Sequence, residues 1–168
     1  MRKLFKVLIL SLGVFTVYII YTGSVKLYDI ATGVIVSLIV SYLTANIVIE
    51  DWRKALDLRR VATFIKFAFR YLLIDEVKAH ALVIRLGLSP RLSLKPAIVK
   101  IPINSRSDYA VTMTSLAITN TPGTVVVDLT EDNSVLYVHW IYATKIEPQE
   151  AYKEVCEVFD SYARKVFD

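Results

Sequence analysis

The sequence predicts an α-helical membrane hairpin and an interfacial (or third membrane) helix, followed by a small α+β domain of β-α-β-β-α order. Three observations support this fold class. Residues 7–25 and 30–49 contain no charged side chain. Basic residues gather at the outer ends of these two segments. The last seventy residues alternate between β-branched runs, turn residues and amphipathic stretches. We therefore expect a hairpin over 1–50, the third helix with a linker over 51–96, and the α+β domain over 97–168.

The two uncharged segments are long enough to cross a bilayer. They contain 19 and 20 residues, so each forms a helix about 30 Å long, which matches the hydrocarbon core. Residues 26–29 alone separate them, which predicts one tight turn. A signal peptide would also begin with cations such as Arg2, Lys3 and Lys6, but its apolar region is shorter and a small-residue cleavage site follows it. We interpret the first segment as an anchor.

The placement of Lys and Arg predicts the sidedness of the hairpin. Three cations precede the first segment, Arg53, Lys54, Arg59 and Arg60 follow the second, and the turn carries only Lys26. The positive-inside rule therefore places the N-terminus and the C-terminal domain in the cytoplasm, in a multi-pass protein of the cell membrane. Residues 1–96 hold 14 Lys/Arg and 6 Asp/Glu, a net +8, whereas residues 97–168 hold 6 and 10, a net −4. This pattern indicates attraction to anionic lipids and excludes a nucleic-acid partner.

Small residues recur every four positions along the second segment, at Gly33, Ser37, Ser41 and Ala45. Such a row forms a shallow groove that lets another helix approach closely. Either the first segment of the hairpin or a helix of a partner subunit can fill this groove, and the sequence leaves both alternatives open.

The third helix is expected over residues 62–84, which contain no Gly or Pro. Lys66 and Arg70 lie one turn apart among aromatic and aliphatic residues. An interfacial helix would turn these cations toward lipid headgroups and its apolar residues inward. A third span would instead carry the acidic domain and many cations to the outer face, against the positive-inside rule. We therefore expect an interfacial or shallowly embedded helix.

A charged cluster within this helix, Asp75, Glu76, Lys78 and His80, allows two interpretations. Ionisable groups inside a membrane often mark an ion or proton path. Charges three or four residues apart on a solvated helix form local ion pairs instead. We favour the local ion pairs and retain the ion path as the alternative.

The C-terminal segment follows a linker over residues 86–96 that contains Gly and Pro. We expect a strand over 97–103, a helix over 109–118 capped by Ser107 or Asp108, a turn at 120–123, and strands over 124–130 and 135–143. Pro148 begins the last helix. One apolar face of that helix carries Ala151, Val155, Phe159, Tyr162 and Val166. A unit this small needs support from a partner or the membrane surface.

No residues in the sequence are arranged for catalysis. There is no nucleophile motif or phosphate loop. Cys156 is the single cysteine, and it lies far in sequence from His80 and His139, so neither a disulfide nor a zinc site is predicted. We interpret His139 as a core histidine and expect no cofactor, no metal and no enzymatic activity. The alternative is a membrane-tethered enzyme or binding module with a pocket near His139 or residues 121–124.

The stretch from Leu88 to His139 carries an ordered set of short motifs. They are Leu88-Ser89-Pro90-Arg91-Leu92, Lys95-Pro96-Ala97-Ile98-Val99, Ile101-Pro102, Ser107-Asp108, Ile118-Thr119-Asn120-Thr121-Pro122-Gly123-Thr124, Val127-Asp128 and Leu136-Tyr137-Val138-His139. Together with the apolar hairpin they resemble the E subunit of the Mrp (Mnh) multisubunit cation/proton antiporters. Asn120 departs from the family, which more often has an apolar residue there.

The resemblance implies a small accessory subunit in a large membrane assembly that exchanges Na⁺ for H⁺. In that family the ion paths belong to large subunits, and the E subunit supports assembly and activity without an assigned catalytic residue. The same module occurs in archaeal membrane-bound hydrogenases and their sulfur-reducing relatives. The expected partners are therefore the other membrane subunits of an antiporter or hydrogenase-type complex, together with the lipid bilayer, and the sequence is compatible with both settings.

Overall fold

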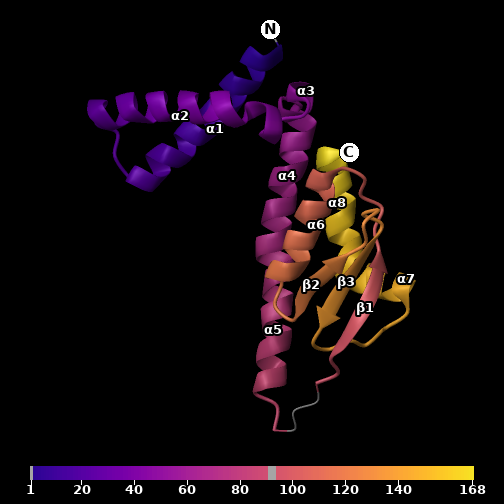
Figure 1. Ribbon diagram of the computed structural model, residues 1–168. Coiled ribbons are helices and arrows are strands. Elements are labelled where there is room, and N and C mark those ends of the chain that lie inside the picture. Colours follow the sequence, from indigo (N-terminus) through magenta and orange to yellow (C-terminus); the bar gives the residue numbers. More distant parts are fainter. Residues whose placement is uncertain (1, 91–93) are drawn as a thin grey trace. The chain divides into compact units, whose positions relative to one another are not determined.

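The computed structural model describes residues 2–90 and 94–168 (Figure 1). The chain divides into two units, the first ending at Leu58 and the second running from Arg59 to Asp168. Arg91 and Leu92, which belong to the linker and to the first of the motifs, lie outside the described residues. This division groups the third helix with the C-terminal residues. The expected boundaries at residues 50 and 96 separate the membrane hairpin, the third helix with its linker and the α+β domain, and they stay predictions.

The first unit is the expected pair of apolar helices. Helix α1 (Arg2–Thr22) and helix α2 (Leu27–Val48) are the two described helices that are long and apolar enough to cross a membrane. Gly23, with a φ of +60°, follows α1, where a left-handed residue commonly ends a helix. The Ser24 hydroxyl donates to Asp29 Oδ2 at 2.6 Å and closes the turn. A short helix, α3 (Trp52–Ala55), completes the unit.

The second unit begins with a longer helix than the sequence predicts. Helix α4 (Leu58–Arg70), a π-helical segment η1 (Tyr71–Asp75) and helix α5 (Glu76–Gly87) follow one another without a break. This long helix runs alongside the rest of the unit (Figure 1). Phe67 and Tyr71 pack against Phe159 and Tyr162 of the C-terminal helix, with ring centroids 5.5–6.2 Å apart. The third helix is therefore part of the core of this unit.

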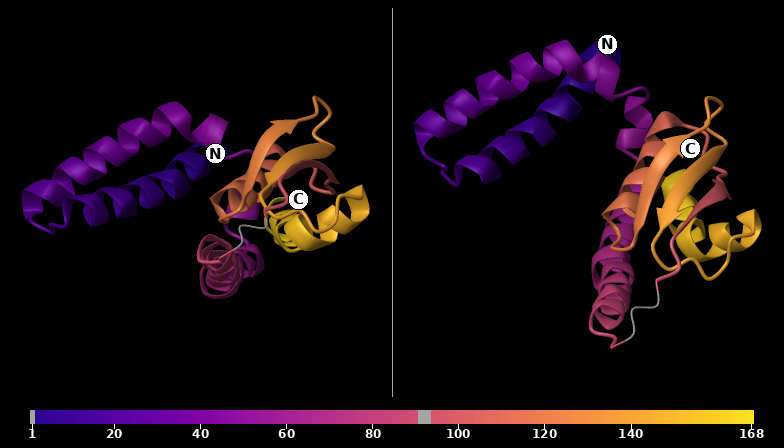
Figure 2. Two further views of the ribbon diagram at one scale, coloured as in Figure 1. Left: turned by 90° about the horizontal axis from the view of Figure 1, so that it is seen from below. Right: turned by 60° about the horizontal axis from the view of Figure 1, so that its bottom comes forward.

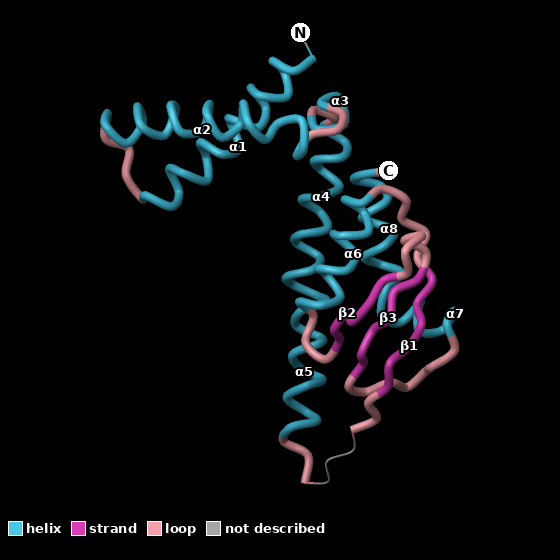
Figure 3. Tube along the Cα trace, viewed as in Figure 1, coloured by secondary structure: helices cyan, strands magenta, loops and turns pink. Residues whose placement is uncertain are grey.

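Three described strands form an antiparallel sheet, β1 (Ala97–Pro102), β2 (Thr124–Leu129) and β3 (Val135–Trp140) (Figure 3). Their order is β1-β3-β2, so β3 is central and pairs with both neighbours. Helix α6 (Asp108–Asn120) connects β1 to β2. After β3 come α7 (Pro148–Ala151), the π-helical η2 (Tyr152–Cys156) and α8 (Glu157–Phe167). A small α+β unit after an apolar hairpin is thus confirmed in outline.

The helices of this unit cover one face of the sheet (Figure 2). Val99, Ile101, Leu136 and Val138 point into the core. Core residues from the helices pack against them, namely Phe67, Val111, Ala117, Ile118, Ala151, Cys156 and Phe159. Ser107 is the N-cap of α6, and its hydroxyl oxygen accepts a hydrogen bond from the Ala110 amide. Of the two expected capping residues, Ser107 and Asp108, the structure therefore uses Ser107.

The interpretation of His139 as a core histidine is wrong. Side chains alternate along a strand, and burial of Leu136 and Val138 sends His139 to the opposite face. There it is half-buried and lies between Ile98 and Val125 on the neighbouring strands. Ile98 and Val125 are themselves exposed, so the helices do not cover this face of the sheet. The alternation predicted which residues share a face with His139, but it did not predict which face the helices cover.

Candidate functional site

The row of small residues on α2 faces α1. Gly33, Ser37, Ser41 and Ala45 are the buried residues of α2. A Cβ atom on Gly33 would lie 2.8 Å from Cδ1 of Tyr18 and 3.1 Å from Cε2 of Phe15. The Tyr18 hydroxyl also lies 3.0 Å from Thr32 Oγ1. Of the two alternatives for the groove, the structure therefore has the first segment of the hairpin filling it.

Three members of the charged cluster of the third helix have partners on the same helix. Asp75 Oδ2 lies 3.3 Å from Arg70 Nε, and His80 Nδ1 lies 3.3 Å from Glu76 Oε2. Lys78 is exposed. The His80–Glu76 pair has the four-residue spacing of an α-helix, whereas Arg70 and Asp75 are five residues apart. The wider turn of η1 brings these two together, and the sequence pattern did not predict this segment.

Tyr71 is a residue in this region that the sequence reasoning missed. It is the first residue of η1, and its hydroxyl lies 3.5 Å from the Ala117 carbonyl oxygen of α6. Burial, together with the hydrogen bond and charge of Glu76, raises the pKa of Tyr71 to about 12. The phenol therefore stays neutral at physiological pH and links η1 to α6. Its spacing of four residues from Phe67 was the available signal for a shared inward face.

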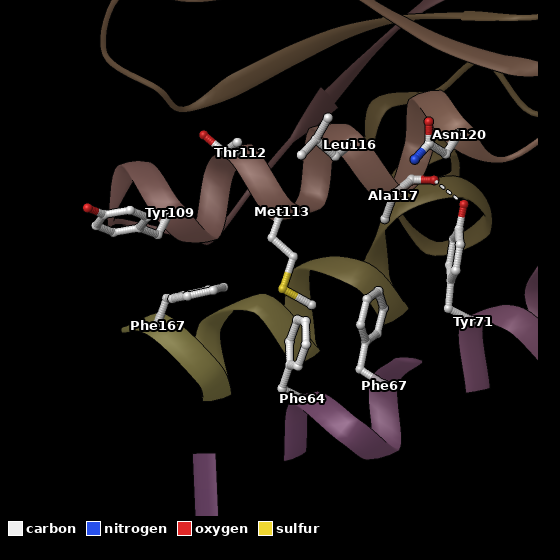
Figure 4. Close-up of a pocket in the computed structure, with 10 residues that line it drawn as sticks. All are labelled: Phe64, Phe67, Tyr71, Tyr109, Thr112, Met113, Leu116, Ala117, Asn120 and Phe167. Carbon is white, nitrogen blue, oxygen red and sulfur yellow. Dashed lines mark hydrogen bonds between the residues drawn. The ribbon is translucent and has the colours of Figure 1, made fainter. Parts of the chain in front are cut away.

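An apolar groove of about 360 Å³ lies between α4, α6 and α8 (Figure 4). Met113 extends from α6 toward the ring of Phe64, while the polar atoms of Tyr71 and Asn120 lie at one end. The full lining comprises Phe64, Phe67, Tyr71, Tyr109, Thr112, Met113, Leu116, Ala117, Asn120 and Phe167. Neither His139 nor residues 121–124 line this groove. Its walls suit an apolar side chain or acyl chain and provide no pair of catalytic acid and base groups.

The comparison with known families identifies the family of the chain. A family model described as MNHE, a Na⁺/H⁺ ion antiporter subunit, matches residues 11–166. The chain belongs to this family. The match begins within α1 and ends within α8, so this MNHE-family chain carries the family pattern through both of its units. With two apolar helices at its start, it is a membrane protein.

Individual relatives agree with the family match. The chain is 23% identical over 161 residues to the E subunit of the Na⁺/H⁺ antiporter of Alkalihalophilus pseudofirmus, covering 96% of each protein. It is 28% identical over 136 residues to the corresponding E subunit of Bacillus subtilis, covering 81% and 82%. A chain in the structure of a membrane-bound sulfane sulfur reductase, an archaeal respiratory membrane complex, superimposes with a TM-score of 0.84 and 22% identity, covering 96% and 99%. This last likeness establishes a shared fold.

Proposed function

We propose that this protein is a non-catalytic accessory subunit of an Mrp-type Na⁺/H⁺ antiporter module and supports its assembly and ion translocation. The module is either a standalone antiporter or part of an archaeal membrane-bound respiratory complex of the hydrogenase type. The observation that carries the proposal is the family match over residues 11–166, which includes both the hairpin and the α+β unit. The E subunit of Alkalihalophilus pseudofirmus has nearly the same length as this chain, which favours the same role.

A structural role agrees with the chemistry of the described residues. Asp75 and Glu76 of the third helix lie against Arg70 and His80 of the same helix, and the groove beside it has apolar walls. We propose that Asp75, Glu76 and His80 shape the helix rather than carry ions. Substitution of Asp75 by Asn should then reduce assembly and transport together. If transport is lost while the complex stays intact, the ion-path alternative is correct.

We further propose that both ends of the chain are cytoplasmic and that other membrane subunits contact the hairpin. The cations at positions 53, 54, 59 and 60, against the single Lys26 in the turn, support this sidedness. The outward-facing side of α2 remains apolar, with Ile35, Ile39 and Leu43 each more than half exposed, so it is suited to lipid or partner helices.

Purification of the tagged chain in mild detergent, followed by mass spectrometry of the eluate, tests the proposal. Large antiporter-type membrane subunits should co-purify in stoichiometric amounts. Iron or nickel in the same eluate would assign the respiratory complex, and their absence the standalone antiporter. A chain that elutes alone from native membranes would contradict the proposal.

Loss of the chain should also affect transport. Vesicles from cells that lack it should show reduced Na⁺-dependent dissipation of a pH gradient, and the reintroduced chain should restore it. Unchanged exchange with an intact complex would contradict a supporting role.

A further inference from the structure

The helix formed by α4, η1 and α5 has two faces with different surroundings. On one face Phe67 and Leu86 are buried, and Val83 Cγ2 lies 3.6 Å from the position a Cβ would take on Gly123. The other face carries large apolar side chains that are 50–81% exposed. This apolar stripe comprises Leu58, Ile65, Phe69, Leu73, Val77 and Ile84. A soluble helix would place polar residues there.

The π-helical segment keeps the stripe on one side of the helix. Ile65, Phe69, Leu73 and Val77 are spaced by four residues, and each such step drifts by about 40° in an α-helix of 3.6 residues per turn. Three steps would carry Val77 about 120° away from Ile65. The wider turn of η1 takes up about one extra residue, or about 100°, and returns the later residues to the original side.

Exposed cations follow one flank of the stripe. By the same helical phase, Lys66, Lys78 and Arg85 lie about a quarter-turn from it, and all three are exposed. The acidic residues of this helix are engaged locally, Asp75 with Arg70 and Glu76 with His80. An apolar stripe with a cationic flank is the pattern of a helix that lies in the interface of a membrane with anionic lipids.

The position of this helix in the chain favours lipid over a protein partner as the occupant of the stripe. Helix α2 ends at Val48 and α4 begins at Leu58, so the connecting residues 49–57 span at most about 30 Å. Within this connection Trp52 stacks on Phe5, with ring centroids 5.0 Å apart, and precedes Arg53. Aromatic and basic residues of this kind gather at membrane–water boundaries. The stripe therefore begins close to a bilayer surface.

We infer that α4, η1 and α5 lie in the cytoplasmic membrane interface, with the apolar stripe toward the acyl chains and Lys66, Lys78 and Arg85 toward anionic headgroups. Because Phe67 and Tyr71 belong to the core of the same unit, the α+β domain is held on the bilayer at a fixed height and rotation. It is not a freely tethered domain. The inference requires the hairpin to span the membrane but does not depend on the antiporter role.

Cysteine labelling of the full chain within its purified complex tests the inference. Phe69→Cys, Leu73→Cys and Val77→Cys each receive a fluorophore, after reconstitution into vesicles of phosphatidylcholine and phosphatidylglycerol whose acyl chains are brominated. Native Cys156 is 1% exposed and provides a low labelling background. Val127→Cys, on the sheet, is the matched control because Val127 is also about half exposed. The three stripe labels should be quenched about twofold more strongly than the control, since the stripe inserts into the acyl region.

The cationic flank has a separate test in the same vesicles. Combined Lys66→Glu and Lys78→Glu substitutions should reduce quenching of the label at position 73, whereas Lys153→Glu, at an exposed position on η2, should not. Replacing phosphatidylglycerol by phosphatidylcholine should have the same effect as the double substitution. Equal quenching at stripe and control positions overturns the inference. Stripe labels that are shielded from the lipid quencher by another subunit also overturn it, and then assign the stripe to a protein partner.

Discussion

Replacing Asp160 by Ala should open the α+β domain, because this carboxylate joins two distant segments. Asp160 is fully buried at the start of α8. Its oxygens accept from the amides of Asn104 and Ser105, at 3.1 and 3.0 Å, and from the hydroxyls of Ser105 and Tyr152, at 2.5 and 2.9 Å. These bonds tie the loop after β1 to the C-terminal helices.

The loss of stability depends on which hydrogen-bond donors lose Asp160 as their acceptor and cannot bind water in its place. The Asn104 residue is exposed, so solvent can satisfy its amide, whereas Ser105 is 4% exposed and retains two buried donors. A buried donor without a partner costs about 1–3 kcal/mol. Removal of the buried charge itself offsets part of this cost. We therefore expect about 3 kcal/mol of destabilisation, which is roughly a hundredfold change in the opening equilibrium.

Alkylation of Cys156 measures this opening in the full chain. The thiol is the single cysteine, is buried, and lies one helical turn before Asp160. Burial and then the charge of Asp160 raise the pKa of the Cys156 thiol, so the closed state reacts slowly. Asp160→Ala should accelerate alkylation by roughly a hundredfold, with a matching loss of thermal stability by near-UV circular dichroism. The thermal measurement separates opening from a change in thiol reactivity.

Asp132→Ala is the matched control for this experiment. Asp132 is exposed in the turn between β2 and β3, where hydrogen bonds from Thr130 and Ser134 lower its pKa. Its loss should leave both Cys156 alkylation and the melting temperature close to those of the wild type. The reasoning is refuted if Asp160→Ala behaves like the wild type, or if Asp132→Ala accelerates alkylation equally.

Three further predictions follow from the glycines and Tyr71. Gly33→Leu should lower the yield and thermal stability of the detergent-solubilised chain, since Tyr18 occupies the space that the new side chain needs; Gly13→Leu, where a Cβ would meet nothing within 4 Å, should do neither. Gly123→Ala should destabilise the protein by about 1–2 kcal/mol because its φ of +98° strains an L-residue, whereas Gly87→Ala, in a helix, should be neutral or slightly stabilising in the same melts. Tyr71, with a pKa raised to about 12, stabilises the fold below the ordinary tyrosine pKa of about 10, and this contribution is lost as the pH rises toward 12. Tyr71→Phe should therefore flatten the alkaline loss of stability between those values, and an unchanged alkaline profile would count against it.

The hairpin and the C-terminal elements could be predicted because their signals are local. The apolar runs that became α1 and α2 are properties of continuous sequence, and so are the Ser107 cap and the helical start at Pro148. The ends of some elements differ from the predicted ends, because contacts with neighbouring segments also decide where a helix or strand stops. The last strand, for example, ends at Trp140 instead of residue 143.

The candidate site was predicted less completely, since it depends on which faces meet. Gly33 was identified as a packing position from its spacing, but the rings of Phe15 and Tyr18 that lie against it are on another helix. Asp75, Glu76 and His80 were identified as parts of a charged cluster. The pairing of His80 with Glu76 follows from their four-residue spacing, whereas the pairing of Asp75 with Arg70 depends on the π-helical turn.

The amino-acid sequence by itself determined that this protein has a membrane hairpin, a basic membrane-proximal half and an α+β unit, because hydropathy, charge and propensity add up along the chain. Only the tertiary structure decided that the third helix supplies Phe67 to the core, that His139 faces outward, and that Asp160 is buried beneath the loop after β1. Each of these outcomes depends on contacts between residues that are tens of positions apart. The free energy of such a contact is set by which surfaces become buried together, and no local pattern records that choice.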